Sequence, residues 1–236
     1  MDPYAWSWNA EALIVILALT IAYVWALRRH PAPAWRLACW VGAMALLLAV
    51  TVTPIETISL EYLLSVHLIQ NVVLAEWAPL LAVLALPTAL AARGPRVPAV
   101  PALALWVVNY GVWHLPWVYD AALRHPHSLL HLEHALYLAT GVLLWWPIVH
   151  GALSPGGKAT YLFAAFLLAS PIGLLMALVP EPIYSFYEEA PRLWGLSPLL
   201  DQQIAGIAMA AAEAVVFFGA FALYVFRFFA EQDAAS

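Results

Sequence analysis

Three histidines of this chain are spaced as metal ligands on a single helix would be. His127, His131 and His134 follow an i, i+4, i+7 pattern, which places their imidazoles on one helix face. Imidazole nitrogens bind copper, zinc and iron, and a thioether such as that of Met209 adds a preference for Cu(I). The carboxylate of Asp201 could orient a ligating imidazole through its second nitrogen. These residue types predict metal binding.

The elements that must position these residues are seven long apolar stretches. A bilayer-spanning helix needs about 20 mostly apolar residues. Runs of that length lie near residues 10–28, 34–52, 60–86, 99–118, 129–150, 159–180 and 201–227. The first run is too long for a cleaved signal peptide and has no basic segment before it, so we expect a retained helix.

The composition agrees with a membrane protein. The chain is 65% apolar and 10% charged, whereas soluble domains are roughly 45–50% apolar and about 25% charged. This excludes a disordered chain, a nucleic-acid binder and an ordinary cytosolic enzyme. We predict an all-α, polytopic membrane protein in which residues 1–236 form a single domain of seven transmembrane helices.

Lysine and arginine predict the orientation of these helices. Seven of the nine basic residues fall in the first, third and fifth connections or near the C-terminus: Arg28, Arg29, Arg36, Arg93, Arg96, Lys158 and Arg227. Only Arg124 and Arg192 fall on the other side. Because cytoplasmic loops carry the excess of Lys and Arg, we expect the N-terminus outside and the C-terminus in the cytoplasm.

With this orientation, most of the histidines lie in one layer of the outer leaflet. Six of the eight belong to this layer: His67, His114, His125, His127, His131 and His134. Polar groups inside a bilayer are costly, and they are usually functional or paired. We predict that His67, His131 and His134 converge in one pocket near Asp201, with His114 at its rim.

The residue types leave the identity of the bound group open. Three neutral imidazoles can hold Cu(I), with Met209 or Met176 as an additional soft ligand. Two of the three histidines could instead be axial ligands of a b-type haem. The same pocket could hold zinc with a bound water, as in an intramembrane hydrolase. In a fourth interpretation the histidines are only hydrogen-bonded, and the protein is a structural subunit of a respiratory complex.

Motifs for other chemistry are missing from the sequence. There is no His-Glu-x-x-His helix, no Gly-x-Ser-x-Gly turn and no phosphate-binding loop. The only lysine, Lys158, lies in a predicted cytoplasmic loop, which excludes a retinal Schiff base, and the single cysteine, Cys39, excludes a disulfide framework. We therefore predict no catalytic residue and no enzymatic turnover.

Two carboxylic residues fall inside the apolar stretches. Glu76 lies in the inner half of the 60–86 helix and Glu213 near the middle of the 201–227 helix. Each would be costly in a bilayer unless it is protonated or paired. Hydrogen bonding to neighbours and a role in a proton path are both open interpretations.

Several short motifs in fixed order resemble one known family. They include Trp113-His114-Leu115-Pro116, His131-Leu132-Glu133-His134, and Asp201-Gln202-Gln203 with Gly206 and Met209 following. His67-Leu68-Ile69-Gln70 also agrees, so the similarity covers roughly residues 60–225. The chain is identified as similar to the polytopic CtaG-like family of cytochrome c oxidase assembly factors.

This resemblance implies a location, partners and a set of residues. It implies a multi-pass protein of the bacterial plasma membrane that assists maturation of a haem–copper oxidase and handles copper at the outer face. The partners would be oxidase subunits and membrane lipid. The family's polar positions correspond here to His67, His114, His131, His134, Asp201 and Met209. Three positions depart from the family, which usually has a second His at Asn71, an apolar residue or Met at Glu76, and Trp at Ala210.

Overall fold

The computed structural model describes residues 2–235, and the prediction of an all-α protein is confirmed. The helices follow one another as α1 (Ala10–Arg29), α2 (Ala34–Val52), α3 (Pro54–Glu61), α4 (Leu64–Val72), the π-helical turn η1 (Val73–Trp77), α5 (Ala78–Ala85), α6 (Thr88–Ala91), α7 (Ala99–Trp113), α8 (Pro116–Arg124), the π-helical turn η2 (Pro126–Leu130), α9 (His131–Val149), α10 (Pro155–Leu178), α11 (Ser185–Glu189) and α12 (Pro198–Ala235).

The chain is a multi-pass membrane protein by the length and composition of its helices. Six helical segments among the described residues are long and apolar enough to cross a membrane: Ala10–Arg29, Ala34–Val52, Leu64–Ala85, Pro126–Val149, Pro155–Leu178 and Pro198–Ala234. The α7 helix is also apolar but has only 15 residues, fewer than the roughly 20 that a full span requires. The sequence predicted a longer helix there, over 99–118.

The α7 helix is short because a proline follows three residues after its last residue, Trp113. Pro116 starts α8, and Leu115 before it has the extended backbone, with φ −65° and ψ 129°, that a following proline favours. The chain therefore turns at His114 and continues as a separate helix. This turn places His114 at the end of the bundle.

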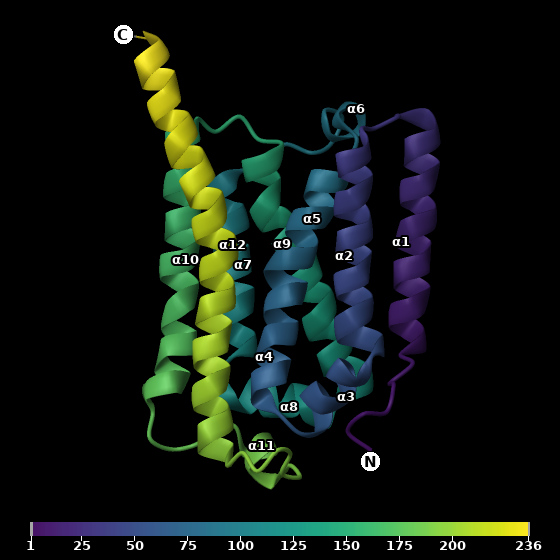
Figure 1. Ribbon diagram of the computed structural model, residues 1–236, viewed down its shortest axis with the longest axis vertical. Coiled ribbons are helices and arrows are strands. Elements are labelled where there is room, and N and C mark those ends of the chain that lie inside the picture. The colour runs from purple at the N-terminus through teal and green to yellow at the C-terminus, as the bar shows by residue number, and fades with distance from the viewer. Residues whose placement is uncertain (1, 236) are drawn as a thin grey trace.

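The long helices form a bundle with small helices at one end. In Figure 1, α3, α8 and α11 lie at the end where the N-terminus lies, and α6 lies at the opposite end with the C-terminus. The α1 helix stands at the edge of the bundle (Figure 1). Only 11% of the residues in its most apolar stretch are buried, against 67% of those in the corresponding stretch of Leu64–Ala85. The α4–η1–α5 segment is therefore the most enclosed of the long segments.

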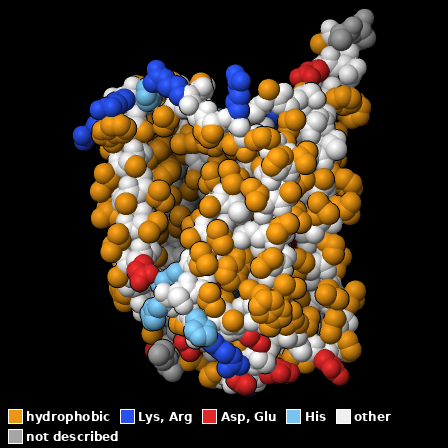
Figure 2. Space-filling view, turned by 180° about the vertical axis from the view of Figure 1, so that it is seen from behind, with side chains coloured by type: hydrophobic (Ala, Val, Ile, Leu, Met, Phe, Trp, Pro, Cys, Tyr) orange, Lys and Arg blue, Asp and Glu red, His pale blue; other side chains and the backbone are white. Residues whose placement is uncertain are grey.

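The polar side chains separate along the bundle. Figure 2 shows most Lys and Arg side chains of one face at the end where the C-terminus lies, and several histidines beside acidic side chains toward the other end. The histidine layer therefore lies toward the end that α3, α8 and α11 cover.

The predicted 60–86 helix is interrupted twice. Tyr62 and Leu63 leave helical geometry between α3 and α4, and a π-helical turn separates α4 from α5. Pro79, just after this turn, has no N–H to donate to the carbonyl of Ala75. The indole Nε1–H of Trp106 donates to that carbonyl instead, at 3.3 Å. The next carbonyl, that of Glu76, accepts from Nε1–H of Trp145 at 3.0 Å.

Close approach of backbones joins α10 and α12. A Cβ atom on Gly206 would lie 2.3 Å from the carbonyl oxygen of Gly173, so the two backbones meet where neither residue has a side chain. Small residues at helix interfaces allow such contact in membranes. The contact holds the N-terminal half of α12, which begins near the histidine layer.

Candidate metal site

Three imidazoles lie near one another at the end of the bundle that α3, α8 and α11 cover. His67 comes from α4, His134 from α9, and His114 from the turn after α7. The ring centroids of His67 and His134 are 6.4 Å apart. The ring of Tyr119 lies near both His67 and His114, with its centroid 5.2 Å from that of His67 and 6.1 Å from that of His114. His67 has no exposed surface and His114 has 7%.

The hydrogen bond of His67 defines which of its nitrogens carries the proton. Its Nδ1 lies 2.8 Å from the hydroxyl of Tyr187. That hydroxyl donates its own hydrogen to the carbonyl of Ser59, so it can only accept from His67. Nδ1 of His67 therefore carries the proton, and Nε2 keeps a free lone pair.

The same logic applies to His114. Its Nδ1 lies 2.8 Å from the backbone carbonyl of Tyr110, which can only accept. Nδ1 therefore carries the proton, and Nε2 again keeps its lone pair. A histidine that ligates a metal normally holds its other nitrogen in such a bond.

The three Nε2 atoms share an unusual state. Those of His67, His114 and His134 are buried and have no hydrogen-bond partner among the described residues. Buried polar atoms are hydrogen-bonded in the great majority of cases. Three buried Nε2 atoms without a partner therefore mark this cluster as the candidate metal site.

The arrangement falls short of a complete coordination shell. Within residues 2–235, no group of three or more His, Cys, Asp or Glu side chains is placed to hold a metal ion together. Within the buried cluster, the ring separation of 6.4 Å between His67 and His134 is close to what two bonds of about 2 Å to one ion require. A third ligand requires side-chain movement.

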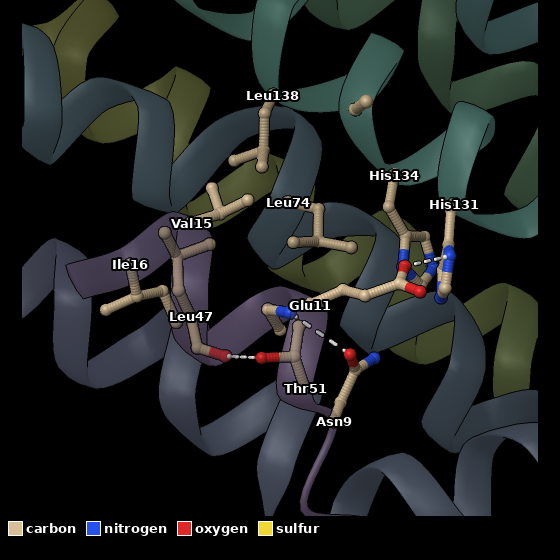
Figure 3. Close-up of a pocket in the computed structure, with 12 residues that line it drawn as sticks. Asn9, Glu11, Val15, Ile16, Leu47, Thr51, Leu74, His131, His134 and Leu138 are labelled. Carbon is tan, nitrogen blue, oxygen red and sulfur yellow. Dashed lines mark hydrogen bonds and ion pairs between the residues drawn. The ribbon is translucent and has the colours of Figure 1, made fainter. Parts of the chain in front are cut away.

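His131 lies apart from His67 in its contacts. Its Nδ1 lies 2.6 Å from the carboxyl oxygen Oε2 of Glu11 in α1, and its ring lies 6.0 Å from that of His127. His131, His134 and Glu11 line a hollow of about 170 Å³ between α1, α2 and α9, and Figure 3 shows the carboxylate of Glu11 reaching His131 beside His134. The structure thus brings together His67 and His134, while His131 turns toward α1.

The carboxylate of Asp201 bonds the start of α4. Its Oδ2 accepts from the backbone N–H of Leu64 at 2.7 Å, and its Oδ1 accepts from N–H and Oγ–H of Ser65 at 3.2 and 2.6 Å. Asp201 of α12 therefore caps the N-terminus of α4, where orphan N–H groups favour a carboxylate. This cap fixes the first turn of the helix that carries His67.

The two candidate methionine ligands, Met209 and Met176, lie in different parts of the bundle. Met209 is fully buried in α12, two turns beyond the cap. Met176 of α10 lines a hollow of about 290 Å³ together with His114. Of the two, Met176 is the one that shares a hollow with an imidazole of the cluster.

The tyrosines of the cluster were missed by sequence reasoning. Asp120 of α8 accepts from the backbone N–H groups of Ser185 and Phe186 at 3.1 and 3.2 Å, and this holds α11 over the bundle. Tyr184 then donates to the carbonyl of His114 at 3.0 Å, and Tyr187 reaches His67. Burial raises the pKa of Tyr187 well above its usual value, so its phenol stays neutral. Nothing in the spacing of these residues predicts that contact.

Replacing Asp201 tests whether it is a cap or a metal ligand. We expect Asp201→Ala to reduce stability by on the order of 2 kcal/mol, because it removes three hydrogen bonds from the buried start of α4. Thermal unfolding in detergent measures this, with Ser197→Ala as the control, since Ser197 caps an exposed N–H of α12. An unchanged melting temperature together with lost metal binding would contradict the capping role.

Comparison with known proteins agrees with the resemblance noted in the sequence. The family model described as cytochrome c oxidase caa3 assembly factor matches residues 19–231. Comparisons with curated proteins and with solved structures give no match. The matched range includes His67, His114, His134 and Asp201, and it covers most of the chain. The chain belongs to the cytochrome c oxidase caa3 assembly factor family.

Proposed function

We propose that this protein binds copper through the imidazoles of His67, His114 and His134 and supplies it to a caa3-type oxidase during assembly. The observation that carries this proposal is the set of three buried Nε2 atoms without a hydrogen-bond partner, two of which, those of His67 and His114, keep a free lone pair. In this proposal copper is the cargo, which the protein receives and passes on.

The donor set favours Cu(I) over other ions. The ligands are neutral imidazoles, and the nearby Met176 adds a thioether, which are the donors that suit monovalent copper. A monovalent ion with few neutral ligands leaves less charge in a dry site than a divalent one. Zinc is almost always held by four ligands or by three and a water, and the described residues bring no such set together.

The surroundings of His67 do not fit a haem. A bis-histidine haem needs its flat macrocycle between two axial rings. The ring of Tyr119 lies 5.2 Å from His67 and that of Tyr187 lies 6.3 Å away. These two fully enclosed phenol rings occupy the space beside His67, so the haem interpretation is not supported by the packing.

We further propose seven transmembrane segments with the N-terminus outside. The apolar α7 helix would be the seventh, with α8 completing its outer end. The concentration of Lys and Arg at the end opposite the histidines supports this orientation. The histidine layer would then face the outer side of the bacterial plasma membrane, where oxidase subunits receive copper in this account.

Copper would enter beside α1. A hollow of about 600 Å³ opens at the end of the bundle, and its polar lining carries Glu11, Glu56, Glu61, His127 and His131. Asn9, Glu11 and His131 also line the 170 Å³ hollow that reaches His134. Carboxylates attract a cation to such an opening, and the imidazole of His131 offers a first ligand on the way to His134.

A competition titration with a Cu(I)-specific chromophoric chelator tests the proposal. We expect the purified protein to bind Cu(I). His67→Ala or His134→Ala should weaken binding by roughly 100-fold, because losing a ligand costs at least as much affinity as losing a residue that only hydrogen-bonds a ligand, which costs about 10- to 100-fold. His125→Ala is the matched control, because the His125 side chain is exposed and its Nδ1 hydrogen-bonds the backbone carbonyl of Ala121, four residues earlier. Equal affinity in all variants would show that the histidines are structural.

A further inference from the structure

Two positive side chains meet at the end of the bundle opposite the histidines. Lys158 lies in the first turn of α10, and Arg227 lies in the part of α12 that runs toward the C-terminus (Figure 1). Nζ of Lys158 is 5.1 Å from the ring centroid of Tyr224, and the guanidinium carbon of Arg227 is 5.5 Å from the same centroid. Two like charges from different helices therefore share one aromatic ring.

The protein does not neutralise these two charges. No ion pair among residues 2–235 includes Lys158 or Arg227. Glu231, one turn beyond Arg227 on the same helix, does not pair with it. The first turn of α10 has no acidic residue, although the positive end of a helix dipole favours negative charge there. Because like charges repel without a counter-charge between them, this place attracts an anion.

The packing of α10 and α12 fixes the ring that the two charges share. The hydroxyl of Tyr224 donates to the carbonyl of Ile148 at 3.2 Å, which ties the ring to the end of α9. A Cβ atom on Gly156 would lie 3.2 Å from the ring of Phe228, so the start of α10 touches α12 just beyond Arg227. The ring is therefore a fixed point from which the two long basic side chains reach outward.

The surroundings of the pair correspond to the surface of a membrane. On either side of Arg227, Phe226 is 74% exposed and Phe229 is 58% exposed. Large apolar side chains exposed on a membrane-spanning helix face lipid, and tyrosines such as Tyr224 are enriched at the level of the headgroups. Long basic side chains extend their charges toward the same level. The anions available at this depth are lipid phosphates.

We infer that Lys158 and Arg227 form a binding site for the phosphate of an anionic phospholipid around the ring of Tyr224. A phosphodiester carries one negative charge on two free oxygens, so it can accept hydrogen bonds from the ammonium and the guanidinium together. Basic sites between transmembrane helices bind anionic headgroups in this way. The exposed rings of Phe226 and Phe229 offer an apolar surface to the acyl chains, which a free anion cannot use.

Lys158 gives a direct test because it is the only lysine of the chain. We expect its amine to react with an acetylating reagent about fivefold more slowly in nanodiscs of phosphatidylglycerol than in nanodiscs of phosphatidylcholine. A bound phosphate holds the amine in its charged, unreactive form, whereas the phosphate of phosphatidylcholine is already neutralised by its own choline. Mass spectrometry of the peptide that contains Lys158 measures the rate in the full chain.

A pair of variants separates a site from a general effect of the charged surface. Arg227→Gln removes half of the site, and the rates in the two kinds of nanodisc should become nearly equal. Arg93→Gln removes the same charge from an exposed loop position at the same end of the bundle, and it should keep the wild-type difference. A general effect of the anionic surface acts equally on both variants.

Three results would overturn the inference. They are no slowing in phosphatidylglycerol, equal slowing in Arg227→Gln and Arg93→Gln, and slowing by inorganic phosphate in phosphatidylcholine nanodiscs at least as large as that by phosphatidylglycerol. Native mass spectrometry tests the other half of the site, because Lys158→Gln should retain less phosphatidylglycerol than Arg93→Gln does. The site contains no histidine of the metal cluster, so a failure of copper binding would leave these results unchanged.

Discussion

Cells in which this protein carries both His67→Ala and His134→Ala should assemble a caa3-type oxidase that lacks most of its copper. The two substitutions remove the pair of imidazoles whose rings lie 6.4 Å apart and whose Nε2 atoms have no other partner. With both gone, one imidazole of the cluster remains, and a single neutral ligand does not retain copper against cellular chelators. The copper content and turnover of the oxidase per haem measure the effect.

Two controls separate copper supply from a structural role. The variant with His125→Ala removes an exposed imidazole that lines none of the three hollows and should leave the oxidase unchanged. Excess copper in the medium should partly restore the oxidase in the variant with His67→Ala and His134→Ala, because a high copper concentration loads the oxidase by mass action without delivery by this protein. A fully copper-loaded oxidase in that variant, at wild-type levels of the protein, would contradict the proposed function.

The stability of the protein should decrease as pH rises toward neutrality, because of Glu56. This residue of α3 lies outside the six long spans, and burial raises its pKa to about 7, although hydrogen bonds from Asn9 and Gln70 act in the opposite direction. Its folded-state pKa lies above the ordinary value of about 4.5, so the folded chain holds a proton that the unfolded chain releases. The stability that this proton supplies is complete below about pH 4.5 and is lost as pH rises through about 7.

The size of this effect is on the order of 3 kcal/mol between pH 4.5 and pH 8. We expect Glu56→Gln to flatten the dependence of the melting temperature on pH, because glutamine does not titrate, while its single carbonyl oxygen can still accept from Gln70. Glu61→Gln, in the same helix but exposed, should keep the wild-type slope. An unchanged slope in Glu56→Gln would assign the pH dependence to another group.

The sequence predicted the helical class and most of the long segments because both follow from composition. A run of about 20 apolar residues has few alternatives to a helix in a membrane. The interruption at Tyr62 and Leu63 was missed because both residues are apolar, so the hydrophobic run continues across the break. The π-helical turn at Val73–Trp77 was missed for the same reason.

The candidate site was predictable only in part. His67 and His134 share a depth, which hydropathy and charge reveal, and the structure brings their rings together. The capping role of Asp201 depends on Leu64, 137 residues earlier in the chain, and no local pattern reports a contact at that separation. His131 shares the helix face of His134 by spacing, yet Glu11 of α1 draws it to the other side.

X-ray absorption spectroscopy of the Cu(I)-loaded protein tests the central claim most directly, because it identifies the atoms bound to copper. We predict a first shell of two or three imidazole nitrogens at about 2 Å, which loses nitrogen scattering in His67→Ala and in His134→Ala and keeps it in His125→Ala. A first shell dominated by sulfur, from Cys39 or from methionines alone, or an identical shell in all three variants, would contradict it.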